Sequence, residues 1–66
     1  MNFGERVRAL REQKGMSQGD LAEKVAVART MVNRIESGVR VPPLMVAVAI
    51  ADTLNTTVDY LVKGDA

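Results

Sequence analysis

Among the features of this 66-residue chain, the complete absence of cysteine and histidine most restricts how it can fold. A domain of this size buries only about 60% of the surface of its unfolded chain and is usually helped by disulfides, a metal or oligomerisation. The composition excludes disulfides and the common Cys/His type of zinc site, so we expect no metal and no cofactor. Close helix packing and self-association remain as sources of stability. Because 47% of the residues are hydrophobic, we expect a folded domain and not a disordered segment.

Every segment between turn-forming residues has the pattern of a helix, and no alternating run of β-branched residues is long enough to predict a strand. N-cap residues precede or begin three of these segments, at Asn2, Ser17 and Thr57. Gly15 and Gly38 end two of them, because glycine accepts the left-handed backbone found just past a helix. The expected helices are 2–14, 18–25, 29–37, 43–54 and 57–64, which predicts an all-α fold.

The fourth expected helix is apolar around most of its circumference. Pro42 and Pro43 suit its start, where a missing N–H costs nothing. We assign its core face to Leu44, Ala47, Val48, Ala51 and Leu54. Its remaining apolar residues lie off that face, and a domain this small cannot cover them alone, so we expect a second subunit to do so. The expected dimer interface comprises Met45, Val46, Ala49 and Tyr60, with Val39 and Val41 beside it; the alternative is a monomer with a somewhat apolar surface.

Charge is distributed unevenly along the chain. Residues 1–40 contain eight Lys or Arg and five Asp or Glu, whereas residues 41–66 contain one Lys and three Asp. This fits a first part that faces a polyanion, although an ordinary scatter of surface charges gives the same numbers. No apolar run approaches the ~20 residues that a membrane span requires, and the charged N-terminal segment lacks the apolar core of a secretion signal. We therefore expect a cytoplasmic protein with no membrane partner.

Residues 18–37 have the spacing of two short helices joined by a tight turn, an arrangement that presents its second helix to a DNA major groove. With Val32 and Ile35 directed into the core, the outer face of that second helix consists of Arg29, Thr30, Asn33 and Arg34. All four side chains form hydrogen bonds, and the two guanidinium groups suit guanine edges or phosphates. The alternative for both arginines is an ordinary solvated surface.

The stretch 11–61 resembles the Cro/CI-type (Xre) helix-turn-helix family, which includes phage repressors and the controller proteins of restriction–modification systems. The matching residues are Arg11, Met16-Ser17-Gln18, Leu21-Ala22, Val25, Val32, Arg34-Ile35-Glu36-Ser37-Gly38, Pro42, Ile50-Ala51, Leu54 and Thr57-Val58-Asp59-Tyr60-Leu61. The resemblance implies a compact five-helix, lambda-repressor-like domain over residues 1–66. It also implies a transcriptional regulator that binds double-stranded DNA. We expect this regulator to bind a pseudo-palindromic operator as a homodimer. We expect no small-molecule effector, because 66 residues leave no room for an effector domain.

The resemblance also implies individual roles. Gln18, supported by Ser17, binds a DNA phosphate at the start of the second helix. Arg29, Thr30, Asn33 and Arg34 face base edges or adjacent phosphates. Ser37 and Arg40 reach the DNA backbone beyond the third helix, and Arg11 pairs with Glu36 to join the first helix to the third. The alternative for Gln18 is a plain helix-start residue.

Three positions depart from the family pattern. Ala26 stands where the turn usually has glycine, so the turn is either left-handed, at a cost of about 1 kcal/mol, or reshaped. Ala28 gives the third helix no capping side chain, which costs about 0.5–2 kcal/mol. Met31 is apolar on a face that is often polar; it either packs over the turn, which we favour, or touches a thymine methyl group.

Other classes of function have less support. A protein-binding module, such as an antitoxin-like partner that uses the apolar fourth helix on a different protein, remains an alternative. We expect no enzymatic activity, because the chain lacks His and Cys, a phosphate-binding glycine loop and an evident nucleophile–base pair.

Overall fold

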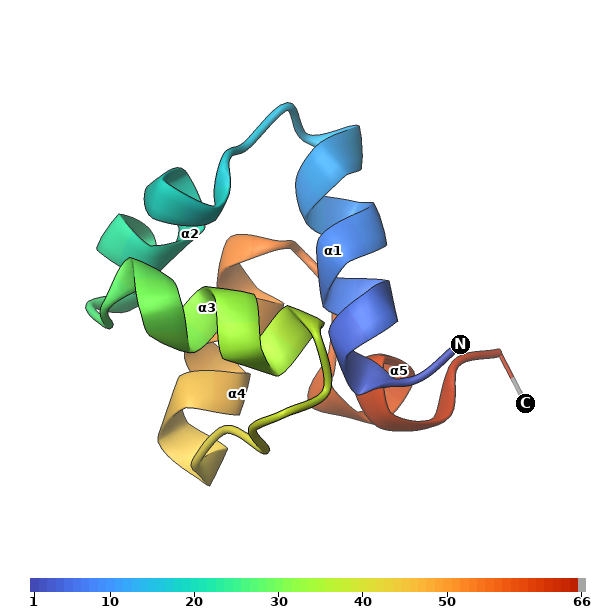
Figure 1. The fold of residues 1–66 in the computed structure, drawn as a ribbon. Helices are drawn as coiled ribbons and strands as arrows, with labels where there is room; N and C mark the ends of the chain where they lie inside the picture. Colours follow the sequence, from blue (N-terminus) through green and yellow to red (C-terminus); the bar gives the residue numbers. More distant parts are fainter. Residues whose placement is uncertain (66) are drawn as a thin grey trace.

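The computed structural model describes residues 1–65, and within them every regular element is a helix. The helices are α1 (Phe3–Gln13), α2 (Gln18–Val25), α3 (Arg29–Glu36), α4 (Leu44–Thr53) and α5 (Val58–Lys63). In Figure 1 the chain runs up α1, turns through α2 and α3, and returns through α4 to α5, so that the start of α1 and the end of α5 lie on the same side of the molecule. The expected all-α, five-helix fold is therefore confirmed.

The helix ends follow local capping chemistry. The Asn2 side chain accepts the N–H of Glu5, and the Glu5 carboxylate accepts the N–H of Asn2, so α1 begins with a capping box. Ser17 and Asp20 form the same reciprocal pair at α2. Four of the expected helix ranges extend slightly beyond the observed helices, because the prediction counted capping residues as helical.

One apolar core lies between the helices, with α3 crossing in front of α4 and beside α1 in Figure 1. Its fully buried side chains are Val7, Leu21, Val32, Ile35, Ile50, Leu54 and Leu61. Gly4 lets α1 approach the end of α3 closely: a Cβ atom at this position would lie 2.7 Å from the carbonyl oxygen of Glu36. The backbone of α1 therefore packs directly against the last turn of α3.

The predicted core face of α4 is wrong in part. Leu44 is 70% exposed and Val48 is 37% exposed, whereas Ile50 is fully buried. Val46 and Ala49, expected off the core face, are partly buried against the core. The buried residues of this segment are Ala47, Ile50, Ala51 and Leu54. Their spacing fits one face of a helix as well as the spacing of the predicted set does. Because α4 is apolar around most of its circumference, its sequence offers little from which its orientation can be read.

None of the helices within residues 1–65 is both long enough and apolar enough to cross a membrane.

Candidate nucleic-acid interface

The turn between α2 and α3 sets how α3 is presented. Ala26 has φ 59° and ψ 44°, so the left-handed alternative for this turn is the observed one. Its N–H bonds back to carbonyl oxygens of α2, and the N–H of Val27 donates to the Ala22 carbonyl oxygen at 3.0 Å. A residue with a Cβ atom costs about 1–2 kcal/mol in this conformation. The remaining contacts of the two helices hold the turn in this shape.

Ala28 begins α3 without a side-chain cap, as the sequence indicates. Met31, one turn later, is partly buried and packs against the core. This contact agrees with the packing role that we favour for Met31. Met31 thereby fixes the start of α3 against the core without using a polar contact.

The outer face of α3 carries an exposed polar groove. Arg29, Thr30, Asn33 and Arg34 are all exposed, and together with Gln18 they line a shallow depression of about 380 Å³ between α2 and α3. Val32 and Ile35, on the opposite face of α3, are buried. The structure therefore brings together five of the side chains expected to contact DNA, on the exposed side of the helix pair.

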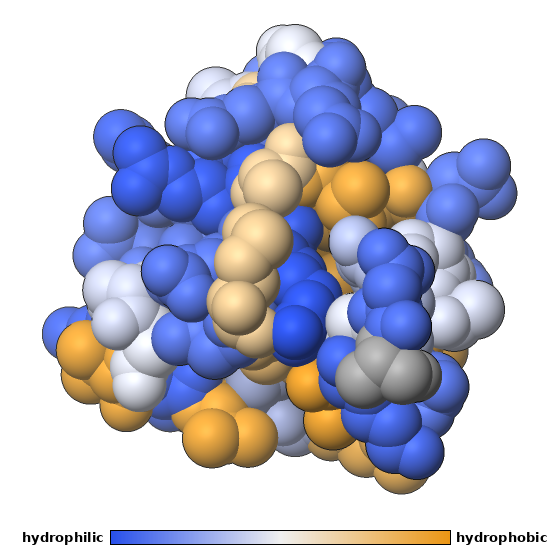
Figure 2. Space-filling view, turned by 90° about the vertical axis from the view of Figure 1, so that its right-hand side faces the viewer, coloured by the Kyte–Doolittle hydropathy of each residue, from blue (hydrophilic) through white to orange (hydrophobic). Residues whose placement is uncertain are grey.

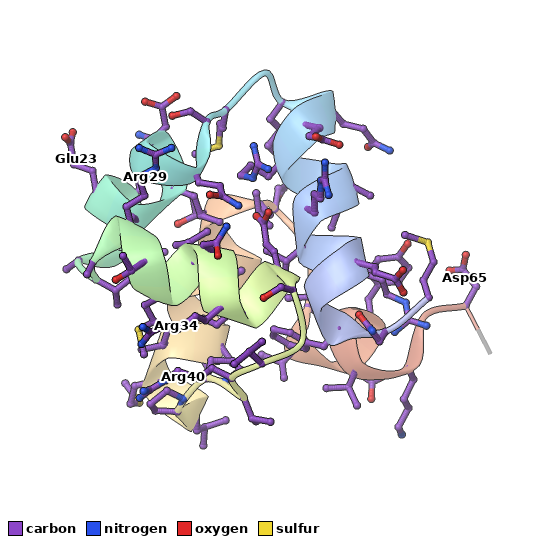
Figure 3. The ribbon with its side chains drawn as sticks, viewed as in Figure 1. Glu23, Arg29, Arg34, Arg40 and Asp65 are labelled. Atoms are coloured by element: carbon purple, nitrogen blue, oxygen red, sulfur yellow. The ribbon has the colours of Figure 1, made fainter. Side chains whose placement is uncertain are left out.

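Positive charge accumulates on this side of the molecule. Figure 3 shows Arg29, Arg34 and Arg40 spaced along the left-hand side, with their side chains directed outward. Within residues 1–65 none of these three guanidinium groups forms a salt bridge. The same part of the chain contains no group of three acidic side chains placed to bind a metal ion. An exposed surface with uncompensated guanidinium groups attracts polyanions.

A buried ion pair lies behind the groove. Arg11 Nε donates to Glu36 Oε2 at 2.7 Å, and Arg11 Nη2 donates to Glu36 Oε1 at 3.0 Å, with the two side chains 9% and 3% exposed. The hydrogen bond to Glu36 raises the pKa of Arg11 above its ordinary value, and burial opposes that shift. Arg11 also donates to the carbonyl oxygen of Met16. The pair joins α1, the α1–α2 loop and the end of α3.

Gln18 is connected to this ion pair, which the sequence did not indicate. Its Nε2 atom donates to Glu36 Oε1 at 3.1 Å, and its Oε1 atom accepts from Asn33 Nδ2 at 3.4 Å. Gln18 is partly buried, whereas Asn33 is exposed. A glutamine at a helix start and a glutamate 18 residues later have no local pattern that predicts their contact. The connection depends on how α2 and α3 cross.

The other expected DNA-contacting residues lie around the groove. Ser17 caps α2, and its N–H donates to the Asp20 carboxylate at 2.9 Å. This bond lowers the pKa of Asp20, with a further contribution from the Ser17 hydroxyl. The hydroxyl of Ser37 donates to the Arg34 carbonyl oxygen at 3.2 Å, so it is engaged at the end of its own helix. Arg40 lies in the following loop and borders a second, apolar groove.

The residues expected at a dimer interface are not equally accessible. Met45 is 77% exposed, but Val46, Ala49 and Tyr60 are partly buried against the protein's own core. Val39 and Val41, which were expected beside that interface, are 77% and 88% exposed. The apolar surface therefore lies mainly on the α3–α4 loop and the start of α4.

Comparison with known proteins identifies the family. Residues 7–61 match the model of a family described as helix-turn-helix. The chain is 31% identical over 64 residues to YqaE of Bacillus subtilis, which is named as an uncharacterized HTH-type transcriptional regulator. The match covers 97% of this chain and 55% of that relative. The chain thus spans about half the length of this curated relative.

Two solved structures are similar to the whole arrangement. The P22 c2 repressor, crystallised with a synthetic operator, superposes with a TM-score of 0.96 at 31% identity and covers 98% of both chains. The restriction–modification controller protein C.AhdI from Aeromonas hydrophila superposes with a TM-score of 0.84 at 36% identity and covers 89% of both chains. The family match extends over most of the sequence, and the similarity of fold includes the helix pair that carries the groove. The chain belongs to the Xre-type helix-turn-helix family, a family of DNA-binding transcriptional regulators.

Proposed function

We propose that this protein regulates transcription by binding a specific sequence in double-stranded DNA, with α3 in the major groove. The observation that carries the proposal is the exposed groove formed by Arg29, Thr30, Asn33 and Arg34 beside Gln18, in a member of a DNA-binding family. A major groove admits an α-helix and displays a distinct donor and acceptor pattern for each base pair. Four hydrogen-bonding side chains on one helix face suit that pattern.

Different residues contribute affinity and specificity. Arg29 and Arg34 neutralise phosphates or donate to guanine edges, and Thr30 and Asn33 contact base edges between them. Ser17 and Gln18 stand at the start of α2, where free N–H groups and the helix dipole favour a phosphate. Arg40 and Ser37 lie beyond the end of α3 and approach the next part of the DNA backbone. Phosphate contacts fix the register, and α3 selects the sequence.

The protein acts as a homodimer in this proposal. An apolar groove of about 550 Å³ lies among the start of α1, the α3–α4 loop, and α4 and α5. Its lining includes Val41, Leu44 and Val62, which are 88%, 70% and 56% exposed. Figure 2 shows hydrophobic patches along the lower edge of the face drawn there, and others at its centre and upper right, among mostly hydrophilic surface. Apolar surface of this kind on a small domain favours a partner.

A second copy is the occupant that the position of the groove favours. Arg40 borders the groove, and Ile35 and Gly38, at and just beyond the end of α3, line it. Two copies that meet here by two-fold symmetry place both α3 helices toward the same side of one duplex. The half-sites of such a dimer lie about 34–36 Å apart, and the operator is pseudo-palindromic. Occupancy of the operator then controls access of RNA polymerase, and the DNA partner places the protein in the cytoplasm of a bacterial cell.

Selection of duplexes from random DNA, followed by binding measurements, tests the DNA-binding part of this proposal. Arg29→Ala and Arg34→Ala are each expected to weaken binding to the selected sequence by about tenfold or more and to reduce its salt dependence. Arg8→Ala is the matched control, because Arg8 is an exposed arginine on α1 that is paired with Glu12. If both variants bind the selected duplex as well as the wild type while remaining folded, the assignment of α3 is wrong.

Sedimentation of the protein alone and on the selected duplex tests the dimer. Leu44→Asp places a charge in the apolar groove and is expected to shift the protein toward the monomer and to weaken cooperative binding of both half-sites. Met45→Asp alters the neighbouring residue, which belongs to the interface expected from the sequence but does not line the groove, so the two variants distinguish the two placements. A larger effect of Met45→Asp than of Leu44→Asp contradicts the placement of the interface. One copy per duplex at saturation contradicts the dimer itself.

A further inference from the structure

We propose that Gln18 is a positioning residue for base recognition: held by the buried Glu36, it fixes the amide of Asn33 so that Asn33 reads an adenine. This inference rests on the proposed placement of α3 in the major groove. It assigns a specific base to one residue of the groove and gives Gln18 a role beyond contact with a phosphate. The two connecting hydrogen bonds are Gln18 Nε2 to Glu36 Oε1, at 3.1 Å, and Asn33 Nδ2 to Gln18 Oε1, at 3.4 Å.

The buried carboxylate of Glu36 determines which group donates in each of these hydrogen bonds. The Glu36 carboxylate accepts two hydrogen bonds from the Arg11 guanidinium and has no proton to donate. Gln18 must therefore present its NH2 group to Glu36, and its carbonyl oxygen then points toward Asn33. Because that oxygen is only an acceptor, Asn33 must present its own NH2 group to Gln18. Neither amide can turn over without placing two acceptors against each other.

The outer end of this series has a defined chemistry. The Oδ1 atom of Asn33 is left without a partner among residues 1–65, and one hydrogen of its Nδ2 atom is not used by Gln18. Asn33 is exposed in the groove beside Thr30 and Arg34. An acceptor beside a donor matches adenine in the major groove, whose N6 amino group donates and whose N7 atom accepts. The anionic oxygens of a phosphate match only the donor.

The rigidity of the series depends on its buried end. The side chain of Glu36 is 3% exposed, and Arg11 is held in addition by the Met16 carbonyl oxygen. An exposed asparagine by itself samples several rotamers and both amide orientations, which reduces its discrimination between bases. The hydrogen bond from Gln18, which is itself held by Glu36, orients Asn33 before DNA binds. The entropy cost of ordering Asn33 on the operator is therefore reduced.

The test compares four proteins: the wild type, Gln18→Met, Asn33→Ala and the control Gln13→Met. Gln13 ends α1, is exposed and does not line the groove, so its replacement repeats the chemical change elsewhere. Each protein is measured against duplexes that carry every single base-pair substitution of the sequence selected by the wild type. Asn33→Ala identifies the base pair that Asn33 reads, expected to be A·T. Gln18→Met is expected to reduce discrimination at that same base pair by about tenfold, whereas Gln13→Met changes nothing.

A second measurement needs no DNA. The side-chain NH2 group of Asn33 gives two nitrogen-bound proton signals in a ¹⁵N-correlated NMR spectrum, and the one bonded to Gln18 is expected to shift in Gln18→Met and to remain in Gln13→Met. Gln18→Ala serves as a second variant if Gln18→Met is poorly folded, as judged by its unfolding midpoint.

The outcomes separate this inference from the proposed function. An equal loss of affinity for every duplex, with unchanged discrimination at the Asn33 base pair, makes Gln18 a phosphate ligand alone and overturns the inference. A preferred base other than adenine at that position also overturns it. Unchanged NMR signals of Asn33 show that the hydrogen bond is absent. A wild-type protein that selects no duplex sequence contradicts the proposed function itself, whatever the NMR result.

Discussion

The guanidinium of Arg11 holds the carboxylate of Glu36 through two hydrogen bonds, of 2.7 and 3.0 Å, in a site that water scarcely reaches. The pair joins α1 to the last turn of α3 and leaves Glu36 Oε1 shared with Gln18. A buried carboxylate that loses its guanidinium partner keeps the cost of desolvation without the compensating attraction. The orientation of α3 and the stability of the molecule therefore depend on the same two side chains.

We expect Arg11→Met to reduce the free energy of unfolding by about 3–5 kcal/mol. This is a large share of the 5–15 kcal/mol that is typical of folded proteins. Urea denaturation at neutral pH measures the change. Adding Glu36→Met to that variant is expected to recover much of the loss, since no unpaired charge remains buried. A double variant less stable than Arg11→Met alone would contradict this account.

Gly4 is expected to tolerate no side chain. Its added Cβ atom would meet the backbone carbonyl of Glu36 at 2.7 Å, and a backbone atom cannot move aside as a flexible side chain does. Gly4→Ala should therefore lower the free energy of unfolding by about 3 kcal/mol. Gly19→Ala is the matched control, because a Cβ atom there meets only ordinary contacts at 3.7 and 4.0 Å. Thermal unfolding should show Gly19→Ala to be stabilised, as alanine is favoured over glycine within a helix.

The left-handed backbone at Ala26 makes this position one where glycine improves stability. We expect Ala26→Gly to raise the free energy of unfolding by about 0.5–1 kcal/mol, because relief of the Cβ contact exceeds the added entropy of the unfolded chain. Ala9→Gly, within α1, should have the opposite sign and a similar size. The midpoints of chemical denaturation of the two variants, each compared with the wild type, measure these changes. Equal destabilisation by both substitutions would show that Ala26 is not strained.

A capping side chain at residue 28 should also stabilise the protein. Ala28 has the extended conformation of an N-cap, with φ −70° and ψ 147°, but offers no side-chain oxygen to the first turn of α3. Ala28→Ser is expected to add about 1 kcal/mol to the free energy of unfolding. Ala28→Val, which has no oxygen, is the control and should add nothing. The effect is read from denaturation curves, and a gain shared by both variants would point to a cause other than capping.

Asp20 is expected to make the stability of the folded protein depend on pH in acid solution. The N–H and hydroxyl of Ser17 lower the pKa of Asp20 from its ordinary value of 3.8 in the folded state. The unfolded state therefore binds the proton more readily, and the stabilisation is present above about pH 3.8 and is lost as the pH falls through the lower folded value. Asp20→Asn does not titrate, so its stability should fall less steeply below about pH 4. A free energy of unfolding measured against pH tests this, and parallel acid limbs would exclude a contribution from Asp20.

Most of the helices can be predicted from the sequence, because their ends depend on contacts between residues close together in the chain. Asn2 and Ser17 start helices through hydrogen bonds to residues three positions away, and Gly15 and Gly38 adopt positive φ angles just past the ends of helices. The same holds for the outer face of α3, since burying Val32 and Ile35 leaves Asn33 and Arg34 outside. Such features need only neighbouring residues and the period of a helix.

What the sequence determined by itself, then, were the helix boundaries, the inward face of α3 and the polar groups that this helix offers to a partner. Only the tertiary structure decided which side of α4 is buried, because this helix is apolar around most of its circumference and its orientation depends on the surfaces packed against it. It also decided that Gln18 turns toward Glu36 and Asn33, since residues on α2 and α3 meet only after the two helices cross. Contacts between distant segments depend on a packing geometry that no local pattern encodes.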